Sequence, residues 1–317
     1  MKIGMNHFLW SGQATRDLIP VIQKLAKMGF DGIEFPIFHS DEGAYRDIRS
    51  ALDELGLGAT GCTVLPEDAY LISPDPAVRR NGVEYLRNAL RMSKVLGCDV
   101  LCGPVYSPVG KMAGRGRTQE EWGWAVEGLR EVGQTAEDLG VTVAVEYLNR
   151  FETYFLNTAA DLMKLVREVG SPGIRMMMDT FHANIEEKDI GDAWRKCGKL
   201  LAHVHISEND RGVPGTGHVH WKEVFGALKD IKYDGWVTIE SFGTTVPEIA
   251  TAASIWRPLF RSNDDVARGG LQFIKKMLGA RNGAGGGTKA PKAKGGKSAG
   301  PRKRMKPAAA ARPRARK

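Results

Sequence analysis

The chain has 317 residues, of which 42% are hydrophobic and 26% are charged, enough for one sizeable core. No apolar run reaches the roughly 18 residues of a membrane span. The N-terminal MKIGMNHFLW lacks the basic and apolar regions of a signal peptide, so we expect a cytoplasmic protein that does not enter the membrane. The four cysteines form no CxxC pair, which argues against a structural zinc site.

The net charge of +8 belongs to the C-terminal end of the chain. Residues 283–317 contain twelve Lys/Arg and no Asp/Glu, and subtracting them leaves 33 basic and 37 acidic residues. This Gly-, Ala-, Pro- and Lys/Arg-rich stretch has too little apolar surface to fold. We therefore predict a single domain over residues 1–280 and a disordered tail over residues 281–317, which we interpret as a solvated appendage, with weak binding of polyanions as the alternative.

Eight short β-rich runs alternate with helical patterns along the rest of the chain. The expected strands are Lys2–Asn6, Asp31–Phe35, Gly58–Thr63, Asp99–Gly103, Val141–Glu146, Ile174–Asp179, Ala202–Ile206 and Trp236–Glu240. The expected helices are Asp17–Met28, Ala44–Leu55, Pro76–Leu96, Thr118–Leu139, Ala159–Glu168 and Trp221–Leu228. This alternation indicates an α/β protein with a parallel sheet, and eight units favour a closed (β/α)8 TIM barrel. No GxGxxG follows the first strand, which argues against a dinucleotide-binding fold.

Four consecutive expected strands each carry one potential metal ligand at or near the C-terminal end. These residues are Glu146, Asp179, His205 and Glu240. Because the C-terminal strand ends of a barrel form its active site, the four side chains should meet at one rim. Three carboxylates and one imidazole suit Mn²⁺ or Mg²⁺, with Co²⁺ as an alternative, better than Zn²⁺.

Three further polar residues follow these strand ends and are expected on loops that reach the substrate. They are Glu152, His182 and Arg211. As an alternative to contacting the substrate, Glu152 could form an ion pair with Arg150. His203 alternates with His205 on the same strand face, and we interpret it as a buried histidine behind the site.

Several segments together resemble the D-tagatose/D-psicose (allulose) 3-epimerases, ketose 3-epimerases of the xylose-isomerase-like TIM barrel superfamily. These segments are VEYLNRFETYFLNT, MMMDTFHANIEE, HVHISENDRGVPGTGHVHW and TIESF, with GFDGIEF and ASIWRPL in keeping. The resemblance covers roughly residues 1–280 and does not include the tail. Members of this family commonly form dimers or tetramers, which implies a homo-oligomer here.

The resemblance also implies a role for each matched residue. Glu146, Asp179, His205 and Glu240 would bind the divalent metal, most simply Mn²⁺. Glu152, His182 and Arg211 would hold O1 and O2 of a free ketose. Glu146 and Glu240 would also be the acid/base pair that inverts C3 through a cis-enediolate, since a single base returns the proton only to the face it left. Asn6, His7, Phe8, Trp10 and the Tyr106–Arg117 loop are candidates for contacts with the far end of the sugar.

Other functions on the same barrel remain alternatives at this stage. An aldose–ketose isomerase or a hydroxypyruvate isomerase shares the enediolate chemistry, and a 2-keto-inositol dehydratase matches the substrate loops less well. An apurinic-site endonuclease needs additional metal ligands. Glu34 is present on the second strand, but the third and fourth strands end in GCT and CGP, without ligands. A non-enzymatic adaptor would bind polyanions through the tail, and removal of residues 283–317 discriminates it from an epimerase.

Overall fold

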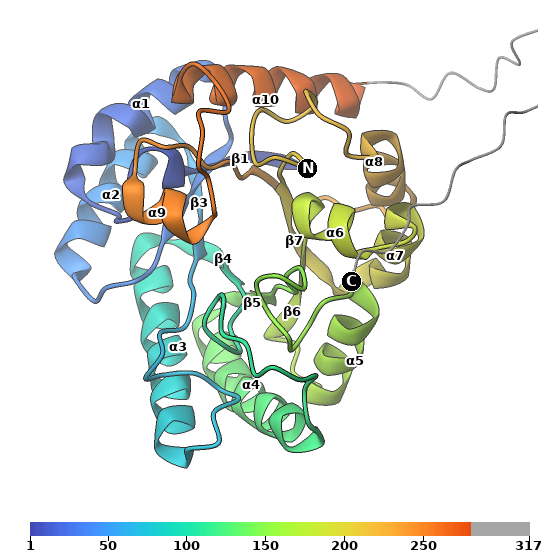
Figure 1. Cartoon of the computed structure of the whole chain (residues 1–317). Coiled ribbons are helices and arrows are strands. Elements are labelled where there is room, and N and C mark those ends of the chain that lie inside the picture. The colour runs from blue at the N-terminus through green and yellow to red at the C-terminus, as the bar shows by residue number, and fades with distance from the viewer. Residues whose placement is uncertain (280–317) are drawn as a thin grey trace, which may run out of the picture. The chain divides into compact units, whose positions relative to one another are not determined.

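In the computed structural model, residues 1–279 are described, and the predicted tail over 281–317 lies outside this range. Within the described residues, eight parallel strands close into a barrel in sequence order, as Figure 1 shows. The strands are β1 (Lys2–Asn6), β2 (Gly32–Pro36), β3 (Gly58–Cys62), β4 (Cys98–Gly103), β5 (Thr142–Val145), β6 (Ile174–Asp179), β7 (Leu201–Ile206) and β8 (Trp236–Ile239). The predicted TIM barrel is confirmed.

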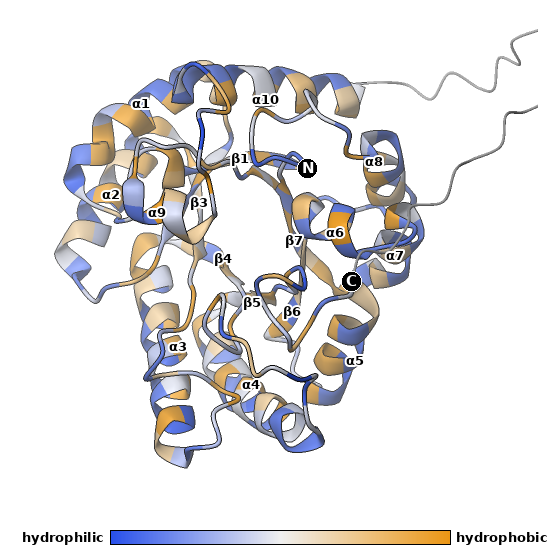
Figure 2. Cartoon of the chain, in the orientation of Figure 1, coloured by the Kyte–Doolittle hydropathy of each residue, from blue (hydrophilic) through white to orange (hydrophobic). Residues whose placement is uncertain are grey.

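Helices surround the ring of strands. They are α1 (Ile19–Met28), α2 (Glu42–Leu55), α3 (Pro76–Leu96), α4 (Gln119–Leu139), α5 (Ala159–Val169), α6 (Thr180–Glu186), α7 (Ile190–Cys197), α8 (Trp221–Asp230), α9 (Pro247–Ala252) and α10 (Asn263–Gly279), with short 3-10 turns η1 (His7–Leu9), η2 (Arg16–Leu18) and η3 (Gly198–Leu200). Hydrophobic and hydrophilic residues alternate along the outer helices in Figure 2. In α2, for example, Tyr45, Ile48 and Leu52 are buried while Arg46 and Asp53 face solvent.

Caps at both ends of the helices direct the chain into the next strand. Helix α4 begins with a capping box in which Thr118 and Glu121 bond each other's backbone N–H groups. It ends at Gly140, whose φ of 66° is left-handed, and α3 ends in the same way at Gly97 with a φ of 83°. These glycines turn the chain from α3 into β4 and from α4 into β5, so every strand runs in the same direction.

The sequence did not predict α6, α7, α9 or α10. Helices α6, α7 and α9 have six to eight residues each, too short for a clear hydrophobic period. The four cysteines are buried free thiols. Among the described residues, no helix combines the length and hydropathy that crossing a membrane requires.

Candidate active site and metal centre

The polar side chains expected at four strand ends converge at one rim of the barrel. Glu146 and Glu240 directly follow β5 and β8, Asp179 ends β6, and His205 is the penultimate residue of β7. All four are buried. Ligand atoms of Asp179, His205 and Glu240 lie within 4.8 Å of one another, and so do those of Glu146, Asp179 and His182. The structure therefore brings together the four residues that the sequence placed at consecutive strand ends.

His205 presents one ring nitrogen to this cluster and the other to the barrel interior. Its Nδ1 lies 3.3 Å from Oε1 of Glu240 and 3.7 Å from Oδ2 of Asp179. This nitrogen is buried and makes no hydrogen bond within the described residues. A buried polar atom without a partner costs about 1–3 kcal/mol. A divalent cation fits here, because it would satisfy Nδ1 and the adjacent carboxylates together.

Arg211 lies within the carboxylate cluster. Its Nη1 donates to Oε2 of Glu240 at 2.7 Å and to Oδ2 of Asp179 at 3.2 Å. Its Nη2 lies 3.1 Å from Nε2 of His182, and its guanidinium carbon lies 3.8 Å from the ring centre of Phe181. The backbone of Arg211 has a φ of 65°, a strained conformation for a residue other than glycine and one that is concentrated at functional sites.

His182 lies in the first turn of α6, and its prediction as a loop residue is wrong. The carboxylate of Asp179 caps this helix, because Oδ1 accepts the backbone N–H groups of Phe181 and His182. The backbone N–H of Asn149 donates to Nδ1 of His182 at 3.1 Å. The side-chain amide of Asn149 donates to Oε1 of Glu152 at 2.8 Å. Burial lowers the pKa of His182 to about 3, so its ring is neutral in the site.

The environment shifts the pKa values of the two glutamates in opposite directions. Burial and the nearby carboxylate of Asp179 raise the pKa of Glu146 well above its usual value. Burial also opposes the charge of Glu240, but the positive charges of His205 and Arg211 outweigh this effect and lower its pKa to about 2. The site thus combines one glutamate that favours its proton with one that favours its charge.

A cavity opens over this cluster. Its polar wall consists of Glu146, Glu152, His182, Arg211 and Glu240, and its other side is formed mainly by Phe8, Phe38, Val64, Val109, Leu148, Phe242 and Ile249. Phe8 and Val109 belong to the segments that the sequence proposed for the far end of the sugar. Asn6 and His7, also proposed, do not line the cavity: Asn6 bonds Glu34, and the buried ring of His7 contacts the carbonyl of Gln13.

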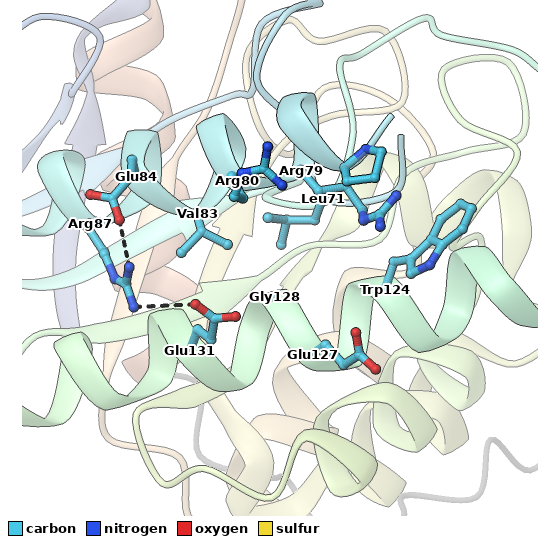
Figure 3. Close-up of a pocket in the computed structure, with 11 residues that line it drawn as sticks. Leu71, Arg79, Arg80, Val83, Glu84, Arg87, Trp124, Glu127, Gly128 and Glu131 are labelled. Carbon is cyan, nitrogen blue, oxygen red and sulfur yellow. Dashed lines mark hydrogen bonds and ion pairs between the residues drawn. The ribbon is translucent and has the colours of Figure 1, made fainter. Parts of the chain in front are cut away.

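A second cavity lies outside the ring of strands, between α3 and α4 (Figure 3). There, Arg87 contacts Glu84 at 2.6 Å and Glu131 at 3.4 Å. The guanidinium carbon of Arg79 lies 4.3 Å from the ring centre of Trp124. These charges already have partners at the surface. Since the active sites of such barrels lie at the C-terminal strand ends, the cavity at the rim is the candidate active site.

Two buried residues of the site were not recognised from the sequence. Glu34 lies on β2 and contacts His205 from below, and Asn149 joins His182 to Glu152. For Asn149, its position in the chain between the predicted site residues Glu146 and Glu152 was the only sequence feature that could have indicated its place in the site. The alternative pairing of Arg150 with Glu152 is not observed, because Arg150 forms its ion pair with Glu186 at 2.9 Å.

Comparison with known proteins agrees with this arrangement. The family described as "Xylose isomerase-like TIM barrel" matches residues 22–277, and the chain belongs to this family. A probable ketose 3-epimerase of Synechocystis sp. is 34% identical over 276 residues, which cover 87% of this chain and 96% of the relative. The D-psicose 3-epimerase of Agrobacterium fabrum is 35% identical over 297 residues, with coverages of 88% and 100%.

The solved structures identify the same branch of the family. The crystal structure of a D-allulose 3-epimerase from Methylomonas sp. matches with a TM-score of 0.83 at 32% identity, covering 88% of this chain and 98% of that one. The chain is therefore a member of the ketose 3-epimerases, which are carbohydrate epimerases of the isomerase class. Both the predicted family and the predicted enzyme class are confirmed.

Proposed function

We propose that this enzyme is a metal-dependent epimerase that inverts C3 of free ketoses of the D-tagatose, D-fructose/D-psicose and ribulose type. In this proposal, the divalent ion, Mn²⁺ in the first instance, is held by Glu146, Asp179, His205 and Glu240. The observation that carries the proposal is the unpartnered Nδ1 of His205, which faces two carboxylates beneath the cavity. When bound, the ion would supply Lewis acidity that stabilises negative charge on the substrate's oxygens.

Glu146 and Glu240 would transfer the proton at C3 of the ketose. They follow β5 and β8, which are separated in the barrel by β6 and β7, so the two carboxylates enter the cavity from different sides. Without the ion their pKa values are shifted in opposite directions, and binding of the ion would favour the ionised form of both, leaving each carboxylate ready as a base. One carboxylate would remove the proton to give a cis-enediolate, and the other would protonate the opposite face.

Glu152, His182 and Arg211 would hold O1 and O2 of the ketose. His182 presents its Nε2 on the side of the cluster, Arg211 supplies a fixed positive charge, and Glu152 can accept from a hydroxyl group. Among the described residues that line the cavity, Arg211 is the only Lys or Arg, and two carboxylates already engage it. A sugar phosphate would lack a cationic partner there, which favours a free sugar.

Incubation of the Mn²⁺-loaded enzyme with D-fructose, D-tagatose and D-ribulose tests the reaction type. We expect the C3 epimers as products, because both glutamates flank one reacting carbon. The phosphorylated ketoses should turn over poorly because the cavity offers no free cation. Chromatography of the products gives the answer, and aldoses in place of C3 epimers would favour the aldose–ketose isomerase alternative.

Substitution of Asn149 by alanine should lower kcat/KM for the ketose by roughly 5- to 30-fold, the effect of losing about 1–2 kcal/mol of hydrogen bonding. The change removes the amide that joins His182 and Glu152. Steady-state kinetics at saturating Mn²⁺ measures it. Asn149→Asp is the matched variant and should be worse, because its charge repels Glu152. Unchanged kcat/KM in both variants would contradict the assigned contacts.

The proposal extends to the cytoplasmic location and the homodimer or homotetramer that the sequence analysis anticipated. Membership of this family supports the proposal of a dimer or tetramer, and light scattering coupled to gel filtration tests it.

A further inference from the structure

Glu34 is a buried carboxylate beneath the candidate metal centre. It lies on β2, opposite Asn6 of β1 and Thr60 of β3, and has no exposed surface. The proposed reaction does not use it. Burial of a carboxylate is tolerated only when hydrogen bonds or opposite charges replace its lost hydration. The groups around Glu34 therefore indicate what the residue does.

Each of the four closest groups around Glu34 can donate a proton to it. Oε1 accepts from Nδ2 of Asn6 at 2.9 Å and lies 2.7 Å from Nε2 of His205. Oε2 accepts from Oγ1 of Thr60 at 2.9 Å and lies 2.7 Å from Nε2 of His203. Each oxygen is thus shared by one neutral donor and one histidine.

The orientation of the Asn6 amide is fixed independently. Its oxygen accepts the backbone N–H of Phe8 at 2.9 Å, so its nitrogen must face Glu34. Asn6, Thr60 and His205 hydrogen-bond this carboxylate, and the ring of His203 lies against its second oxygen without completing a hydrogen bond within the described residues. The cluster of Glu34, Cys102, His203 and His205 is therefore better explained as a hydrogen-bonded group than as a second metal site.

This arrangement determines which nitrogen of His205 is free. Because Glu34 only accepts, the ring must place its proton on Nε2, at 2.7 Å from the carboxylate. Nδ1 points at the oxygens of Asp179 and Glu240, and when the ion displaces its proton, the lone pair of Nδ1 would face the ligand cluster. A histidine binds a metal through such a lone pair, and an acceptor behind the ring fixes both the tautomer and the ring orientation.

We propose that Glu34 is a positioning residue of the metal centre, which accepts the Nε2 proton of His205 and so directs its Nδ1 lone pair into the ligand cluster. His203 supports this role, because it contacts the second oxygen of Glu34 and its ring packs edge-on against His205, with ring centres 5.2 Å apart. This inference rests on the proposed function, in which His205 is a metal ligand.

The isosteric substitution Glu34→Gln tests the inference by titration calorimetry with Mn²⁺. The amide replaces one acceptor by a donor, so we expect the Kd for Mn²⁺ to rise by roughly 10- to 100-fold. The matched control is Thr60→Val, which removes a donor to Glu34 but leaves its contact with His205, and whose Kd should stay within about threefold of wild type. At saturating Mn²⁺, the KM of Glu34→Gln for the ketose should remain close to the wild-type value.

Nitrogen-15 NMR of the wild-type protein, loaded with diamagnetic Mg²⁺, gives a second measurement that does not depend on the folding of a variant. We expect a proton on Nε2 of His205, and a proton on Nδ1 would overturn the inference. An equal Kd for Mn²⁺ in wild type and Glu34→Gln would overturn the positioning role of Glu34 but leave the proposed metal centre intact. No Mn²⁺ binding by the wild type would overturn the proposed metal centre and this inference with it.

Discussion

Replacement of either Glu146 or Glu240 by glutamine should abolish C3 inversion while the barrel stays folded. An amide is a poor metal ligand and neither accepts nor gives up a proton at neutral pH. Loss of general acid–base catalysis alone costs roughly 10²- to 10⁴-fold in rate. Because each carboxylate is both a proposed ligand and a proposed acid/base group, we expect turnover to fall by at least about 10³-fold in each variant.

Proton exchange in D₂O separates the two glutamates. If they act on opposite faces, each variant retains one working base and should exchange the C3 proton of one epimer without inverting it. Glu146→Gln and Glu240→Gln should then exchange opposite epimers, which mass spectrometry and NMR of the recovered sugars measure. Exchange of the same epimer by both variants would contradict the two-base assignment.

Glu152→Gln is the matched control for these variants. Glu152 lines the same cavity but is not a proposed metal ligand, and its side chain accepts from Asn149. We expect a reduced kcat/KM with an unchanged Kd for Mn²⁺. Circular dichroism and thermal unfolding would check that all three variants fold. Near-normal turnover in Glu146→Gln or Glu240→Gln would overturn the catalytic assignment.

The strands were predictable because each is a short β-rich run beside a long amphipathic helix. The observed ends of all eight strands differ from the predicted ends by at most one residue. Helix α10 was missed because its sequence begins NDDVARGG, in which two adjacent glycines have low helix propensity. A Cβ atom at Gly270 would lie 2.7 Å from Cδ1 of Ile239, so the glycine that obscured the helix allows its close packing against the side chain of Ile239 in β8.

The cluster at the rim was predictable because its members occupy the same place in four consecutive strands. The residues that support this cluster could not be predicted in the same way, because only closure of the barrel brings them near the metal-ligand candidates. Glu34 is 171 positions before His205 in the chain and reaches it across the barrel interior. Arg211 was placed correctly in the loop after β7, but its ion pairs with Asp179 and Glu240 depend on a left-handed backbone that no sequence pattern indicated.

Removal of the divalent ion by a chelator should abolish turnover, and Mn²⁺ should restore it. Binding of the ion should also release protons. Burial and Asp179 raise the pKa of Glu146, and Glu34 and Glu240 overcome the effect of burial to raise the pKa of His205 well above its usual value. Both groups therefore hold their protons to higher pH than an ordinary glutamate or histidine, whereas a metal binds only their deprotonated forms.

The sign of the pH dependence follows from these shifts. As pH falls through the raised pKa values, protons compete with the ion, so the Kd for Mn²⁺ should rise roughly tenfold per pH unit for each proton displaced. Glu240, with a pKa of about 2, should contribute no proton near neutrality. Calorimetry in two buffers with different ionisation enthalpies counts the released protons. A Kd that is constant between about pH 6 and pH 8, with no proton release, would contradict the assignment of Glu146 and His205 as ligands.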